Sequence, residues 1–108
     1  MIKVNIYKNS EGKSVGFKLK GHAGYDDIGK DIICAATSVL AINTINSIER
    51  FTDDDMSVVS DEKKALIEFR LYGNISPESR VLLDSLELGL SQIRKDNAEY
   101  ISITFKEV

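Results

Sequence analysis

Short runs of alternating apolar and polar residues, interrupted by two longer segments with helical periodicity, constrain the fold of this chain more than any other feature. Two such runs open the sequence, with apolar residues at every second position from Ile2 to Ile6 and from Val15 to Leu19. Alternation of this kind turns one side of a strand toward a core. Turn residues around Gly12 separate the two runs, so we expect a β-hairpin here.

Two helices are expected after this hairpin. The first should begin near Asp31, whose short carboxylate is typical of a helix N-cap, and should end at about Glu49 or Arg50. It is so apolar that we expect the rest of the fold to cover most of it. The second should begin at Ser76, because serine is a good N-cap and Pro77 suits the first helical position.

Three further extended runs complete the pattern, at residues 56–59, 65–71 and 100–105, and the acidic connector 52–55 is expected to be exposed. The element order is therefore ββαββαβ. It predicts an α+β, two-layer domain in which two helices cover a five-stranded, mainly antiparallel sheet. The chain has 108 residues, which suits a single domain over residues 1–108.

The net charge, the apolar runs and the number of cysteines indicate which partners and which cellular location to expect. The chain carries 14 basic and 17 acidic residues, a net charge of −3, which argues against direct binding to nucleic acid. The first residues do not form a signal peptide, and no run approaches the roughly 18 apolar residues that span a bilayer. One cysteine cannot form an internal disulfide. We therefore expect a cytoplasmic protein without a membrane partner.

The glycine-rich segment of residues 21–31 holds the only histidine, His22, and leads to the only cysteine, Cys34. In the first turn of a helix, unpaired amide groups and the helix dipole would stabilise the thiolate of Cys34. The imidazole of His22 could remove the thiol proton as a general base. The alternative is that Cys34 is a small core residue without chemistry.

Residues 21–38 carry a recognisable pattern: Gly-His-Ala, a glycine-containing loop, Gly-x-Asp, two apolar residues, Cys-Ala and a following serine. This pattern resembles the signature of the bacterial ribosomal-processing cysteine protease family, Prp. The resemblance implies a cysteine endopeptidase without a cofactor or metal, with Cys34 as nucleophile and His22 as general base. It also implies a substrate, the precursor of large-subunit ribosomal protein number twenty-seven, whose short N-terminal extension ends in paired aromatic residues next to a small one.

Further positions match the family pattern in a supporting role. Asp31 is expected to cap the helix and anchor the loop, and orienting His22 is the alternative. Ser38 lies one helical turn after Cys34 and faces the same side, where it either packs or takes part in the site. Gly21 and Gly24 are expected to meet a backbone requirement and not to contact the substrate.

A loop between His22 and the helix is expected to bind the substrate and to gate the site, with a permanently ordered connector as the alternative. Its six residues are Gly24, Tyr25, Asp26, Asp27, Ile28 and Gly29. An apolar cleft should adjoin Cys34, with Tyr25, Ile28 and Ile32 as candidate lining residues, although Ile32 could instead pack in the core. The acidic residues of this segment lack the spacing of a calcium loop, so no metal site is expected.

A second class of function stays open at this point, a non-catalytic ribosome-associated or RNA-binding module. Rapid, pH-dependent alkylation of Cys34 that requires His22 would favour the protease, and slow alkylation independent of His22 would favour the module. The sequence also leaves open whether two copies of the chain associate as a homodimer.

Overall fold

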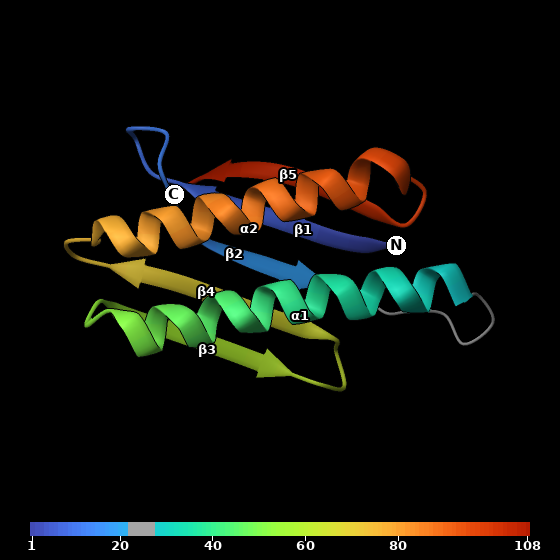
Figure 1. Cartoon of the computed structure of the whole chain (residues 1–108), viewed down its shortest axis with the longest axis horizontal. Helices are drawn as coiled ribbons and strands as arrows, with labels where there is room; N and C mark the ends of the chain where they lie inside the picture. The colour runs from blue at the N-terminus through green and yellow to red at the C-terminus, as the bar shows by residue number, and fades with distance from the viewer. Residues whose placement is uncertain (22–27) are drawn as a thin grey trace.

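Five strands form one sheet, and both helices pack on the same face of it (Figure 1). The computed structural model describes residues 1–21 and 28–108, and for residues 28–31 it describes only the backbone. The elements follow in the predicted order, ββαββαβ, which confirms the α+β two-layer class.

The sheet is mixed but mostly antiparallel, as expected. Its strands are β1 (Ile2–Lys8), β2 (Ser14–Lys20), β3 (Asp55–Asp61), β4 (Leu66–Tyr72) and β5 (Ile101–Glu107). They lie side by side in the order β3-β4-β2-β1-β5. Only the pair of β1 and β5 is parallel, at one edge of the sheet. This order, which the sequence did not predict, brings the β3–β4 hairpin next to the end of β2.

The core lies between the sheet and the helices. Alternation along β1 buries Val4 and Ile6, and the strand register sets them opposite Leu19 and Phe17 of β2. Phe17 in turn lies opposite Phe69 of β4, with the two ring centroids 5.6 Å apart. The helices contribute a second set of buried apolar side chains: Ile33, Ala41, Ile45, Ile48, Leu83, Leu86 and Leu90.

Helix α1 spans Ile28–Phe51 and therefore begins three residues before the predicted start. Asp31 is the fourth residue of the helix and not its N-cap, so the predicted cap is wrong. Ile28 and Gly29, which we expected in the loop, are helical as well. A glycine costs a helix only about 1 kcal/mol, which is too little to delay the start of a long helix.

Helix α2 spans Pro77–Asp96 and begins where the sequence predicted. Ser76 is its N-cap, and the Ser76 hydroxyl accepts a hydrogen bond from the amide of Ser79 at 3.2 Å. Pro77 occupies the first helical position, where no amide hydrogen is needed.

The acidic connector before β3 is not wholly exposed, which corrects the prediction for Asp54. The Asp54 carboxylate is half-buried and accepts hydrogen bonds from the amide and hydroxyl of Ser76 and from the hydroxyl of Ser79. Its neighbour Asp53 is exposed, and Asp55 is the first residue of β3. Asp54 thus ties the connector to the start of α2.

Helix α1 is less covered than its apolar composition predicted. Ile32, Val39 and Phe51 expose more than 60% of their surface, at 61%, 66% and 69%. The stretch Ile32–Phe51 is long and apolar enough to span a membrane by length and mean hydropathy alone, contrary to the expectation that no segment approaches this. A helix that packs on a sheet meets the same criterion, and here Ile33, Ile45 and Ile48 are buried in the core.

Candidate active site

Cys34 is the seventh residue of α1 and lies in its second turn. Only the first amides of a helix lack an intrahelical acceptor, so the amide of Cys34 is not one of them. The expectation that Cys34 lies in the first turn is therefore wrong, and its own amide cannot serve as a free hydrogen-bond donor. The Cys34 side chain is half-buried and packs against the edge of the core.

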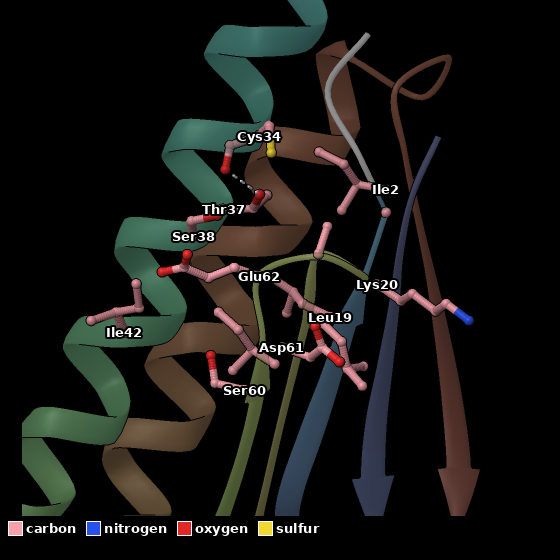
Figure 2. Close-up of a pocket in the computed structure, with 14 residues that line it drawn as sticks. Ile2, Leu19, Lys20, Cys34, Thr37, Ser38, Ile42, Ser60, Asp61 and Glu62 are labelled. Atoms are coloured by element: carbon pink, nitrogen blue, oxygen red, sulfur yellow. Dashed lines mark hydrogen bonds between the residues drawn. The ribbon is translucent and has the colours of Figure 1, made fainter.

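Thr37 fixes the helical turn that carries Cys34. Its side chain is 1% exposed, and its hydroxyl can donate to the carbonyl oxygen of Ile33 at 2.9 Å or of Cys34 at 3.0 Å (Figure 2). A buried hydroxyl that bonds back to its own helix restrains the backbone locally. The sequence marked Thr37 only as a departure from the family pattern, in which an aliphatic residue is common at this position, and predicted no structural role for it.

Cys34 lines a cavity of about 210 Å³ between α1 and the end of the sheet (Figure 2). This is smaller than the roughly 300–1,000 Å³ of pockets that enclose a drug-sized ligand, so it suits one or two side chains of a longer molecule. Among the described side chains, those of helix α1 on the lining are Cys34, Thr37, Ser38 and Ile42. The sheet contributes apolar side chains, including Ile2, Leu19, Leu66 and Ile67.

The expected apolar cleft beside Cys34 is present, but its walls differ from those predicted. Ile32 is largely exposed and belongs neither to the core nor to the described lining of the cavity. The side chain of Ile28 and all of Tyr25 lie outside the described residues. Ser38 lines the same cavity as Cys34, as expected from its position one turn later.

The histidine and most of the predicted loop lie outside the part of the chain that the structure describes. This holds for His22, Gly24, Tyr25, Asp26 and Asp27, together with the predicted gating. The structure likewise leaves the direction of the Asp31 side chain undescribed. The roles of these residues remain predictions.

Gly21 is the last described residue before this segment. Its backbone conformation and surroundings require a glycine. Its φ is +143°, and a Cβ atom here would lie 2.6 Å from the carbonyl oxygen of Met1 and 2.8 Å from the Cα of Ile2. Any side chain would collide with the start of β1. Gly21 therefore meets the expected backbone requirement, and it also lines the cavity.

The turn between β3 and β4 forms a wall of the cavity that sequence analysis missed. Asp61 at the end of β3 and Glu62 and Ala65 of the turn lie on the lining. They are distant from Cys34 in sequence, and only the strand order brings them to it. Among the described residues, no group of three His, Cys, Asp or Glu side chains is arranged to hold a metal ion.

Comparison with known proteins identifies the family. Residues 1–102 match the family model described as Cysteine protease Prp. The chain belongs to this family. It is therefore a ribosomal processing cysteine protease, and membership excludes the alternative of a non-catalytic module as its class.

Two curated relatives support this assignment over nearly the whole chain. The ribosomal processing cysteine protease Prp of Staphylococcus aureus (strain Mu50) is 27% identical over 106 residues, which cover 98% of this chain and 100% of that protein. The protein of the same name from Bacillus subtilis (strain 168) is 20% identical over 108 residues, with 96% of each chain covered.

A solved structure extends the likeness to three dimensions. The crystal structure of an essential ribosomal processing protease Prp from S. aureus, in complex with a substrate peptide, matches with a TM-score of 0.90 and 26% identity. The match covers 98% of this chain and 100% of that one. The fold of this protease is thus shared at full length with a relative that binds a peptide.

Proposed function

We propose that this protease removes the short N-terminal extension of the precursor of large-subunit ribosomal protein number twenty-seven, with Cys34 as its nucleophile. One observation carries the assignment of the nucleophile: the chain has a single cysteine. A cysteine protease needs a thiol, so Cys34 is the one residue that can supply it. Its place on the wall of a partly apolar cavity supports this role.

His22 is the general base of the proposed reaction, because it is the only imidazole in the chain. It removes the proton from the Cys34 thiol, and the thiolate sulfur attacks the carbonyl carbon of the scissile peptide bond. The carbon–nitrogen bond then breaks, and the imidazolium returns the proton to the departing amine. Water hydrolyses the resulting thioester, which releases the carboxylate of the extension and restores the thiol.

The cavity beside Cys34 suits the apolar end of the proposed extension. Ile2, Leu19 and Ile42 offer it apolar surface, and burying one aromatic side chain there would contribute about 1.5–3 kcal/mol to binding. A reaction that depends on a free thiol fits a reducing compartment, and we place it in the cytoplasm.

The test is cleavage of the unprocessed ribosomal protein by the purified enzyme, followed by intact mass. We expect Cys34→Ala to lower the cleavage rate by at least about 10³-fold, because the nucleophile is lost. The melting temperature should change little, since Cys34 is only half-buried. Full cleavage by this variant would exclude Cys34 as the nucleophile.

Two controls separate the parts of the proposal. Alkylation of Cys34 by iodoacetamide should be fast in the wild type and slow in His22→Ala, which tests the base without any substrate. Replacing the paired aromatic residues of the precursor by alanine should reduce cleavage strongly. Undiminished cleavage of that precursor would place recognition outside the cavity.

A further inference from the structure

The turn between β3 and β4 presents a carboxylate to the cavity that the proposed chemistry does not use. Glu62 lines this cavity, and its side chain extends from the turn toward α1, the helix that carries Cys34 and Ser38 (Figure 2). The Glu62 carboxylate has no hydrogen bond or ion pair with any other described residue. It is therefore available to a ligand.

The other charges on this wall are already engaged or directed elsewhere. The Asp61 carboxylate accepts a hydrogen bond from the backbone amide of Lys64 at 3.2 Å, inside the turn. Lys20 is the only described basic residue on the lining, and its ammonium extends away from α1 (Figure 2). Among the described lining residues, Glu62 is thus the charged side chain that extends toward α1 without a partner.

Hydrogen bonds hold the turn that carries Glu62 in place. The carbonyl oxygen of Glu62 accepts from the amide of Ala65, and the carbonyl oxygen of Ala65 accepts from the amide of Gly21, each at 3.2 Å. Ala65 has a φ of +49°, a left-handed conformation that is unusual for a residue other than glycine. The turn is therefore fixed to the end of β2, and its position relative to the cavity is defined.

We propose that Glu62 is a specificity-determining residue that selects a lysine or arginine side chain next to the scissile bond of the substrate. The inference rests on the proposed function and adds a charge requirement to it. A peptide whose scissile carbonyl lies at Cys34 must cross a cavity that Glu62 also lines. Proteins that bind ribosomal RNA carry lysine and arginine to neutralise phosphates, so a substrate of this class offers the complementary charge.

The experiment uses synthetic peptides that contain two aromatic residues followed by a small one, with glutamine at the flanking positions. A single lysine is moved through these positions, and kcat/KM is measured for each peptide. With the wild-type enzyme, lysine at one position should raise kcat/KM by about fivefold, the upper range for an ion pair near solvent. The gain should shrink in 0.5 M salt, because the pair is partly screened.

Variants of the enzyme assign this gain to Glu62. Glu62→Gln should remove the preference for lysine, so that the ratio of kcat/KM between the lysine peptide and the all-glutamine peptide falls to about one. Glu62→Lys should reverse the preference, so that glutamate at the same position becomes the better substrate. Glu49 is an exposed glutamate near the other end of α1, and Glu49→Gln and Glu49→Lys serve as matched controls that should keep the wild-type preference.

The outcomes distinguish this inference from the proposed function. If the lysine preference is absent in the wild type, or persists in Glu62→Gln, the role of Glu62 is excluded while the protease assignment stands. If Cys34→Ala cleaves the peptides as fast as the wild type does, the nucleophile assignment fails and the preference must be explained by another site.

Discussion

The two helices lie side by side on one face of the sheet, yet they are built in different ways. Helix α2 starts at a serine N-cap reinforced by the Asp54 carboxylate, and it buries Leu83, Leu86 and Leu90 along one side. Helix α1 carries the only cysteine near its start, where the side chain of Cys34 is half-buried. Each helix also has an exposed apolar side, with Val39 of α1 at 66% and Val81 of α2 at 67%.

The first two turns of the helices serve different purposes: those of α2 stabilise the fold, and those of α1 carry the nucleophile. Side chains at the start of α2 provide hydrogen-bond partners for its first turn and tie this turn to the connector before β3. The second turn of α1 instead borders a cavity, where Cys34 is only half-buried. A nucleophile needs access to substrate, so this part of α1 cannot be packed as completely as α2.

The largest effect that tests this comparison is expected in the core of α2. Leu90 is 0% exposed, so Leu90→Ala should lower the free energy of unfolding by about 2–5 kcal/mol through lost burial and a cavity. Val39→Ala, on the open side of α1, should change it by less than about 0.5 kcal/mol. Urea unfolding monitored by circular dichroism measures both values.

Equal destabilisation by Val39→Ala and Leu90→Ala would contradict the difference in burial between these two positions. That result would mean that the exposed side of α1 is covered in solution, and the loss should then depend on protein concentration if a second copy covers it.

A smaller effect is expected at the start of α2. The Ser79 side chain is 0% exposed and donates its hydroxyl hydrogen to Asp54. Asp54→Ala leaves this hydroxyl without an acceptor and should cost about 1–3 kcal/mol of stability, while cleavage by the folded enzyme is retained. Asp53→Ala, at the exposed neighbour, is the matched control and should have little effect.

The loss caused by Asp54→Ala should depend on pH. Burial disfavours ionisation of Asp54, but the hydrogen bonds from Ser79 and Ser76 outweigh it and hold the pKa of the carboxyl below its ordinary value of 3.8. Because the folded-state pKa is lowered, the stabilisation is present above pH 3.8 and falls as the pH drops through the folded-state pKa. The difference in stability between the wild type and Asp54→Ala should therefore become smaller at acidic pH, and a difference that stays constant would contradict this origin.

The sequence predicted those parts of the fold whose signals are local. Periodicity identified all five strands and both helices, and the serine-proline pair marked the start of α2 correctly. The start of α1 was misplaced because aspartate is favourable both as an N-cap and within the first turn, where the helix dipole stabilises it. Local patterns do not separate these two positions.

The sequence predicted the cysteine of the candidate site but not the residues that line the other side of its cavity. Cys34 could be identified because it is the only cysteine in the chain, and the position of Ser38 beside it could be predicted from helical spacing. Glu62 and the role of Asp54 depend on contacts between segments that are far apart in sequence: the partners of Asp54 are 22 and 25 residues away. Such contacts require the strand order, which no single segment encodes.

The smallest effect is expected where the two helices meet. A Cβ atom at Gly89 of α2 would lie 3.2 Å from Cδ1 of Leu40 on α1. The contact is tight, but Leu40 is only half-buried and its flexible end can rotate away. Alanine favours helix over glycine by about 1 kcal/mol, so Gly89→Ala should stabilise the protein by about 0.5 kcal/mol after this adjustment.

The double variant Leu40→Ala/Gly89→Ala tests whether the Leu40 side chain limits the gain from Gly89→Ala. Removing the Leu40 side chain relieves the contact, so the gain from Gly89→Ala should rise toward the full 1 kcal/mol in that background. Thermal unfolding of the four proteins in the cycle measures the coupling. If Gly89→Ala destabilises the wild type but not the Leu40→Ala variant, the Leu40 side chain is held rigidly between the helices and cannot rotate away from the added methyl group.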